Sequence, residues 1–213
     1  MGRTVMKPGE RKNQILDVAE SLFRTEGYNK TTTSKIAKEA GVANGTLFYH
    51  FESKEKLADA LVARKLHEDL DVFAVISNNP SLSGFQKLAW FFVFELDDQT
   101  NHLNRYHYMT SIENLVLQQK MFQQMVTMYT PIMTEWLVQA QNEGTIKIDN
   151  PSLTAEFFLT TFHHWVDGSL NQWTKQERIS RIESIQPYFE KLFGVSTGTL
   201  ALANLRQSLP ANL

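Results

Sequence analysis

The most informative part of the chain is TTTSKIAKEAGVANGTLFYHFESKEKLADAL, residues 31–61. Its threonines at positions 31–33 offer hydroxyl groups that cap the start of a short helix. Gly41 and Val42 then predict a tight turn, and a second short helix follows over about residues 44–51. Two short helices joined by a turn behind a supporting helix form the helix-turn-helix arrangement, whose second helix enters the DNA major groove.

The second short helix has one buried and one exposed face. At about 100° per residue, Leu47 and Phe51 point inward, whereas Gly45 and Tyr49 point directly away from them. The outward face therefore presents small and aromatic residues to a partner. Phe48 lies on a flank, where a core position and a DNA-facing position fit the pattern equally well.

Helical periodicity extends along the rest of the chain. A first helix begins near Pro8 and ends at Gly27, and a long fourth helix starts after a capping Ser53 and ends at Asn78-Asn79-Pro80. Pro187 is expected to kink the last long helix or end it early. Residues 145–149 alternate like a strand without a partner strand, which favours an extended loop. The later helices are expected over about residues 82–98, 103–117, 120–143, 152–173 and 175–193.

The fold class is therefore all-α. A three-helix DNA-binding domain over residues 1–53 is joined by the long fourth helix to a C-terminal helical domain over residues 54–194. The tail, residues 195–213, either forms a short amphipathic helix or stays loose.

Composition narrows the function classes. The 213 residues include 21 basic and 23 acidic ones, yet residues 1–65 hold 12 basic against 8 acidic. A basic head on an acidic body is the electrostatic pattern of a protein that contacts a polyanion with one end. The absence of cysteine excludes disulfides, thiolate metal sites and cysteine nucleophiles.

No membrane association is expected from the sequence. The longest strongly apolar run, residues 88–94, is far shorter than the roughly 20 residues of a membrane span. The start, MGRTVMKPGERKNQ, has no apolar stretch resembling a signal peptide. We therefore expect a cytoplasmic protein.

Residues 10–61 closely resemble the DNA-binding head of the TetR family of one-component transcriptional regulators. The motifs that carry the resemblance are IAKEAGV, NGTLFYHF and SKEKL. Beyond them, only the helix layout and the segment WVDGSL (165–170) match. The resemblance implies a homodimer that binds a palindromic operator, usually as a repressor. It also implies that a small molecule entering the C-terminal domain, which would bind effector and form the dimer, releases the DNA.

The resemblance further implies roles for individual residues of the head. Thr33 should contact a phosphate, and Ser34 and Lys35 are placed for base or phosphate contacts. Asn44 and Gly45 lead the recognition helix into the major groove. The other implied contacts are Thr46, Tyr49 and His50 on phosphates or adjoining groups, Lys54 on the DNA backbone, and Phe48.

Two positions depart from the family pattern. Phe48 stands where tyrosine is frequent, which removes a hydroxyl contact but leaves an apolar surface that suits a thymine methyl group. Ala43 stands where a capping serine is common, so that Asn44 or water must satisfy the helix start. Few side chains here are arginine or lysine aimed at guanine. The DNA sequence is therefore expected to be read by Asn44, Ser34 and apolar contacts.

The C-terminal domain is rich in large apolar and aromatic side chains. Most of them are expected in the core, but aromatic residues also line apolar ligand cavities between helices. The pattern does not separate the two sets, and an apolar or aromatic effector fits it. The pocket candidates are Phe91, Phe94, Tyr108, Met109, Met128, Trp136, Phe158, Phe162 and Trp165.

Glu156, His163 and Asp167 share one face of a predicted helix and offer ligands for a divalent metal or haem. Their spacing matches no recognised motif, and a hydrogen-bonded or solvated histidine fits equally well. A metal- or haem-responsive regulator of the same fold is therefore the alternative to a small-molecule effector. No cofactor is expected.

The last two predicted helices carry an apolar stripe that suits a twofold contact between subunits. Packed against its symmetry mate, the stripe forms a four-helix bundle, whereas packed on its own subunit it belongs to the core. DNA geometry favours the dimer, because two recognition helices must enter major grooves about 34–36 Å apart. The stripe consists of Leu170, Trp173, Ile179, Ile182, Gln186 and Phe189.

Two functions of other classes were weighed against a regulator. A helical enzyme lacks support, because the chain has no glycine-rich phosphate loop, GxSxG motif, HExxH motif or cysteine nucleophile. A helical interaction module gives no reason for the exposed face from Gly45 to Tyr49. The sequence therefore predicts a regulator that is not an enzyme, with operator DNA, a small molecule and a second copy of itself as partners.

Overall fold

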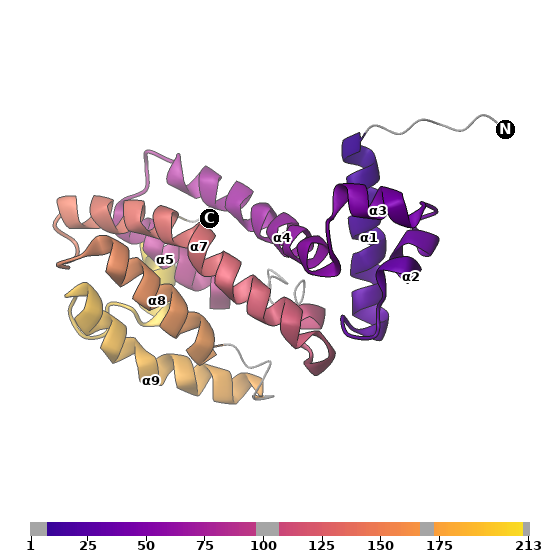
Figure 1. Ribbon diagram of the computed structural model, residues 1–213. Helices are drawn as coiled ribbons and strands as arrows, with labels where there is room; N and C mark the ends of the chain where they lie inside the picture. The colour runs from indigo at the N-terminus through magenta and orange to yellow at the C-terminus, as the bar shows by residue number, and fades with distance from the viewer. Residues whose placement is uncertain (1–7, 97–106, 167–172, 211–213) are drawn as a thin grey trace. The chain divides into compact units, whose positions relative to one another are not determined.

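The computed structural model describes residues 8–96, 107–166 and 173–210, and these residues contain helices and no β-strand (Figure 1). None of the described helices is long and apolar enough to cross a membrane. The all-α prediction is confirmed. The α-helices are α1 (Pro8–Glu26), α2 (Thr33–Glu39), α3 (Asn44–His50), α4 (Lys54–Ser77), α5 (Gly84–Leu96), α7 (Leu115–Asn142), α8 (Pro151–Val166), α9 (Lys175–Phe193) and α10 (Leu202–Ser208).

The contacts divide the chain into two compact units. The first consists of Met1–His67 with Tyr108–Gln124, and the second consists of Glu68–His107 with Met125–Leu213. Both α4 and α7 therefore begin in the first unit and end in the second. The first unit is larger than the predicted domain of residues 1–53, because it also includes residues 54–67 and Tyr108–Gln124, a segment that follows α5 in the chain.

The first unit is built on the apolar face of α1. Ile15, Ala19 and Phe23 are fully buried there, and α2 and α3 lie together beside this helix (Figure 1). Gly27 ends α1 with a φ of 85°, a left-handed conformation that favours glycine, as its position in the sequence predicts.

Charged side chains connect α4 to α1 within the first unit. The guanidinium of Arg64 lies 2.6 Å from the Asp17 carboxylate and 3.0 Å from that of Glu20. Lys65 reaches Glu20 at 3.1 Å. Ser53 caps α4 by accepting a hydrogen bond from the Lys56 backbone at 3.2 Å, which confirms its predicted role.

The second unit has an aromatic core centred on α4. The ring of Phe73 lies between 4.7 and 6.0 Å, centroid to centroid, from five other aromatic rings contributed by α5 and α7. Helices α8 and α9 lie side by side (Figure 1) and pack through Phe158 and Phe189. Gly84 allows α5 to approach α7 closely, because a Cβ there would lie 2.2 Å from the backbone nitrogen of Ala140.

The structure differs from one predicted helix and settles the tail. Within the predicted helix of residues 103–117, two 3-10 turns cover His107–Thr110 and Ile112–Asn114, and α7 begins at Leu115 and continues through residues 118–119. Residues 103–106 of that prediction lie outside the described residues. Helix α9 has the predicted bounds of residues 175–193, so Pro187 does not end it early. The tail forms the short helix α10, which packs on α5, and residues 145–149 are the predicted extended loop.

Candidate DNA-binding site

Local sequence signals shape the two short helices of the head. Thr32 caps α2, since its hydroxyl accepts a hydrogen bond from the Lys35 backbone at 3.2 Å. Gly41 follows with a φ of 62°, and Val42 closes the turn by donating its N–H to the Ala37 carbonyl at 2.9 Å. The predicted helix-turn-helix is therefore present, with α3 as its second helix.

Helix α3 is anchored by one face and open on the other. Leu47 and Phe51 are 0% and 3% exposed, as their four-residue spacing predicts. Tyr49 on the opposite face is 83% exposed, and Phe48 is 47% exposed. The exposure of Phe48 decides between the two positions that fit the sequence, because its ring is available to a partner. Ala43 precedes the helix without a side-chain cap, as its methyl group requires.

Three polar or small residues lie at or near the start of α3. Asn44, Gly45 and Ser34 are all exposed. The amide nitrogen of Asn44 lies 3.5 Å from the Ser34 hydroxyl, at the limit of a hydrogen bond, so the structure brings together the two polar residues expected to read bases. Thr33, Thr46 and His50 are half-buried, and the His50 ring lies edge-on to Tyr49 with centroids 5.2 Å apart.

The structure assigns both lysines of the predicted contact set to partners within the protein. Lys35 forms an ion pair with Glu26, although its side chain is still 42% exposed. Lys54 donates to the backbone carbonyls of Tyr28 at 2.7 Å and Thr31 at 2.9 Å, and its ammonium lies 4.1 Å from the centre of the Tyr28 ring. Burial lowers the pKa of Lys54, while nearby Glu55 acts in the opposite direction.

These contacts give Lys54 a role within the protein, and its contact with the DNA backbone stays a prediction. Two of its three N–H donors hold the turn between α1 and α2, so its first role is to position the head. Sequence reasoning missed this role, and it missed Tyr28 altogether, because the contact joins residues 26 positions apart. The long distance in sequence left no local signal.

The predicted effector candidates fall into three groups. Tyr108 and Met109 lie in the first unit and are buried. Met128 and Trp165 are half-buried in the second unit, where the Trp165 ring packs 4.1 Å from the guanidinium of Arg181. The remaining five are at most 9% exposed and contact other rings of the second unit: Phe91, Phe94, Trp136, Phe158 and Phe162.

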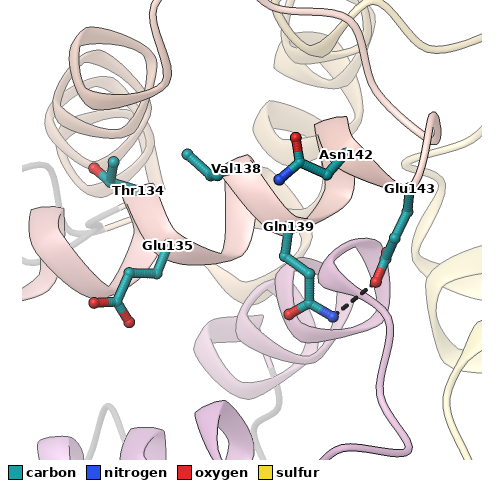
Figure 2. Close-up of a pocket in the computed structure, with 6 residues that line it drawn as sticks. All are labelled: Thr134, Glu135, Val138, Gln139, Asn142 and Glu143. Atoms are coloured by element: carbon teal, nitrogen blue, oxygen red, sulfur yellow. Dashed lines mark hydrogen bonds between the residues drawn. The ribbon is translucent and has the colours of Figure 1, made fainter.

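One pocket of about 470 Å³ lies on the second half of α7. Figure 2 shows its lining side chains, among which Gln139 donates a hydrogen bond to Glu143 at 2.7 Å. The lining residues are Thr134, Glu135, Val138, Gln139, Asn142 and Glu143, and none of them was an effector candidate. An aromatic effector pocket therefore stays a prediction.

The described residues contain no group of three histidine, aspartate or glutamate side chains that could hold a metal ion. Glu156 is exposed on α8 and His163 is half-buried, whereas Asp167 lies outside the described residues. The structure therefore describes Glu156 and His163 of the predicted metal or haem site, but not Asp167.

The predicted subunit-contact stripe is only partly at the surface. Phe189 is 2% exposed and packs against Phe158 of its own subunit, which argues against its place in an interface. Ile182 and Gln186 are half-buried on α9. Trp173 packs 3.8 Å from the Arg181 guanidinium. Ile179 lies in α9, and Leu170 lies outside the described residues.

Among the side chains of α8 and α9 whose burial the structure describes, the large exposed apolar ones are different from those of the stripe. Leu153 is 62% exposed, Phe157 is 55% exposed and Tyr188 is 70% exposed. Leu153 and Phe157 are four residues apart and therefore share one face of α8. These three residues are called the α8–α9 surface below.

Comparisons with known proteins agree with this geometry. Residues 15–61 match the family described as bacterial regulatory proteins, tetR family, and residues 99–187 match the tetracyclin repressor-like C-terminal domain. The HTH-type transcriptional repressor KstR2 of Rhodococcus jostii is 40% identical over 52 residues, which are 24% of this chain and 26% of that protein. That match therefore covers about a quarter of the relative's length.

Two further comparisons cover most of the chain. The HTH-type transcriptional regulator TtgR of Pseudomonas putida is 28% identical over 179 residues, which are 80% of this chain and 83% of that protein. The crystal structure of a transcriptional regulator of the TetR/AcrR family from Thermobifida fusca superposes with a TM-score of 0.58. It is 22% identical, and the match covers 83% of this chain and 96% of that one, so it is a likeness of fold.

Proposed function

The chain belongs to the TetR family of bacterial regulatory proteins, and on this premise we propose that it is a transcriptional repressor released from its operator by a small molecule. The observation that carries the proposal is α3, whose outer face exposes Tyr49 and Phe48 while Leu47 and Phe51 hold the helix in place. Exposed aromatic side chains mark an interaction site, and the second helix of a helix-turn-helix is the element that binds the DNA major groove.

The outer residues of α3 divide by the part of the DNA they suit. Asn44 has the donor and acceptor pair that recognises adenine in the major groove, and Phe48 suits a thymine methyl group. Tyr49, His50 and Thr46 supply hydroxyl and imidazole groups for phosphates, as does Thr33 at the start of α2. In this proposal Lys54 positions the head, and phosphate binding falls to the other residues.

Two copies of the chain are proposed to bind one operator. A repressor with one recognition helix per subunit reads a palindrome only as a twofold dimer. The α8–α9 surface supports this assembly, because it leaves two large side chains on α8 and one on α9 without cover in the single chain. Ile182 and Gln186 of the predicted stripe, which are half-buried on α9, are retained in the proposed interface, and Phe189 is not.

The effector is proposed to be an apolar or aromatic molecule bound among the helices of the second unit. The support is the density of aromatic side chains there, where Phe73 alone contacts five rings. Effector binding must favour a conformation that fits DNA poorly, because a ligand with equal affinity for both states shifts nothing.

A DNA titration tests the proposal. The full chain is titrated with duplexes from its own promoter region at two salt concentrations, beside a Tyr49→Ala/His50→Ala variant. A Val75→Ala variant serves as the control, since Val75 is exposed on α4 outside α2 and α3. We expect selective, salt-sensitive binding that the double variant loses and the control retains. Equal binding by the double variant would show that α3 is not the DNA-binding surface.

A further inference from the structure

A buried asparagine joins the end of α1 to the segment that precedes α7. Asn114 is 2% exposed, and its side-chain oxygen accepts the backbone N–H of Tyr28 at 2.7 Å. Its amide nitrogen donates to the carbonyls of Phe23 at 3.0 Å and Tyr108 at 2.8 Å. One side chain therefore bonds to the backbone of three residues, the most distant of which, Phe23, lies 91 positions from Asn114 in the sequence.

The hydrogen bonds at position 114 require an amide side chain. A buried polar group is costly unless it is hydrogen-bonded, and Asn114 uses both its acceptor and its donor. An aspartate would place a second oxygen against two carbonyl oxygens, and a leucine would leave the Tyr28 N–H without its acceptor. Asparagine therefore supplies both the acceptor and the donor that this site needs.

Neighbouring contacts bring the same two segments close together. A Cβ on Gly27 would lie 2.8 Å from the Cβ of Glu113, and the left-handed φ of Gly27 already favours glycine. The guanidinium of Arg24 lies 4.6 Å from the centre of the Tyr108 ring. The close approach and the cation–π contact hold residues 108–114 against the last turn of α1.

The hydrogen bonds of Asn114 hold the turn between α1 and α2, which directly precedes the helix-turn-helix. Asn114 holds Tyr28 by its N–H, and Lys54 holds the same residue by its carbonyl. Thr31, at the other end of the turn, donates its hydroxyl to the Gly27 carbonyl at 2.8 Å. The turn between α1 and α2 is therefore fastened both to the start of α4 and to the residue directly before α7.

We propose that Asn114 is a positioning residue that couples α7 to the DNA-binding head. Because α7 begins one residue after Asn114 and continues into the second unit, a change at the start of the helix reaches the backbone of the α1–α2 turn through the hydrogen bonds of this amide. This inference rests on the proposed function, since DNA is the ligand at the head. By linkage, DNA bound to the head must in turn steady residues 108–117.

Hydrogen exchange of the full chain, with and without a saturating operator duplex, tests the coupling. In the wild type, we expect DNA to slow exchange both in α2–α3 and in residues 108–117. In Asn114→Ala, we expect the Tyr28 amide to exchange roughly tenfold faster without DNA, since it loses its acceptor. We also expect protection by DNA to be confined to the head in that variant.

Two measurements separate loss of coupling from loss of folding. All four tryptophans (90, 136, 165 and 173) belong to the second unit, so their fluorescence reports whether that unit stays folded in Asn114→Ala. Asn204→Ala is the matched control, because the Asn204 amide donates only to the nearby Gly198 carbonyl on the surface. Its exchange pattern with DNA should equal that of the wild type.

A second variant disturbs the contact between the same two segments from the α1 end. Gly27→Ala forces Glu113 away from the turn, and we expect it to lose the DNA-dependent protection of residues 108–117 as Asn114→Ala does. Gly144→Ala carries a similar backbone strain at a φ of 74° with open space around it, and should keep the protection.

The outcomes distinguish the coupling from the proposed function. A wild-type chain that binds no duplex would refute both. A wild-type chain that binds DNA without slowing exchange in residues 108–117 would refute the coupling alone. Undiminished protection of that segment in Asn114→Ala, with its tryptophan fluorescence intact, would likewise overturn the role of Asn114.

Discussion

Substituting Gly45 by alanine should stabilise the protein and weaken its binding to DNA. Gly45 is exposed in α3, and a Cβ at this position would meet no atom within 4 Å. The fold therefore gives no reason for glycine, which is less favourable in a helix than alanine by up to about 1 kcal/mol. We expect Gly45→Ala to raise the free energy of unfolding by a few tenths to about 1 kcal/mol, with the lower end favoured so near the helix start.

The reason for glycine must then lie in the partner that approaches α3. A methyl group on the outer face occupies space that a base edge needs, and one disrupted base contact costs about 1–3 kcal/mol, or roughly 5- to 150-fold in affinity. We expect specific binding to fall by this factor at constant salt, with non-specific binding unchanged.

Competition titrations and chemical unfolding followed by circular dichroism measure the two effects on the same samples. Gly9→Ala is the matched control, because Gly9 is also exposed in a helix with nothing within 4 Å of the added Cβ. It should gain stability without losing affinity. If Gly45→Ala binds its operator as tightly as the wild type does, this face of α3 does not lie against the bases.

Three further predictions concern packing, pH and assembly. Gly84→Ala should destabilise the second unit by at least about 1–3 kcal/mol, because its Cβ would meet backbone atoms of Trp136 and Ala140; an unchanged unfolding midpoint by tryptophan fluorescence would contradict this close approach. Burial, with a contribution from Glu55 and Asp59, raises the pKa of Tyr28 to about 12, so its contribution to stability is complete below pH 10 and is lost as the pH rises towards 12. Tyr28→Phe should therefore make the alkaline fall in unfolding free energy shallower, by at most about 1.4 kcal/mol per pH unit, and parallel curves for the two proteins would count against the shift. Phe157→Asp should convert a dimer to a monomer in sedimentation equilibrium, whereas Val138→Asp, at an exposed position on α7, should not; a dimer that survives Phe157→Asp would place the interface elsewhere.

The helix-turn-helix was predictable because its signals are local. Threonine caps, the left-handed Gly41 and the four-residue spacing of Leu47 and Phe51 each act within a few residues. The face of α3 that stays open follows from the same spacing. Only the position of Phe48 needed the structure, since a flank residue is buried or exposed according to what packs beside it.

Long-range contacts explain the parts that the sequence did not predict. Residues 107–114 form 3-10 turns instead of a helix, and there the Asn114 amide holds backbone atoms of Phe23, Tyr28 and Tyr108. Lys54 has the position of a phosphate contact in the family pattern, yet two carbonyls of a distant turn hold it. Neither pairing leaves a trace in the local pattern of residues.

The subunit stripe shows a different limit. A helical stripe identifies an apolar face but not the molecule that covers it. Phe189 is covered by Phe158 and Phe162 of its own chain, whereas Phe157, on a face of α8 that the sequence analysis did not single out, is exposed.

In the proposed function, two copies of α3 read DNA through successive major grooves. Duplexes that bind the full chain are selected from a random pool, and the enriched sequence is then probed by chemical protection. We expect an inverted repeat in which major-groove atoms are protected in two half-sites about one helical turn apart. No enriched sequence, or protection confined to the minor groove, would contradict it.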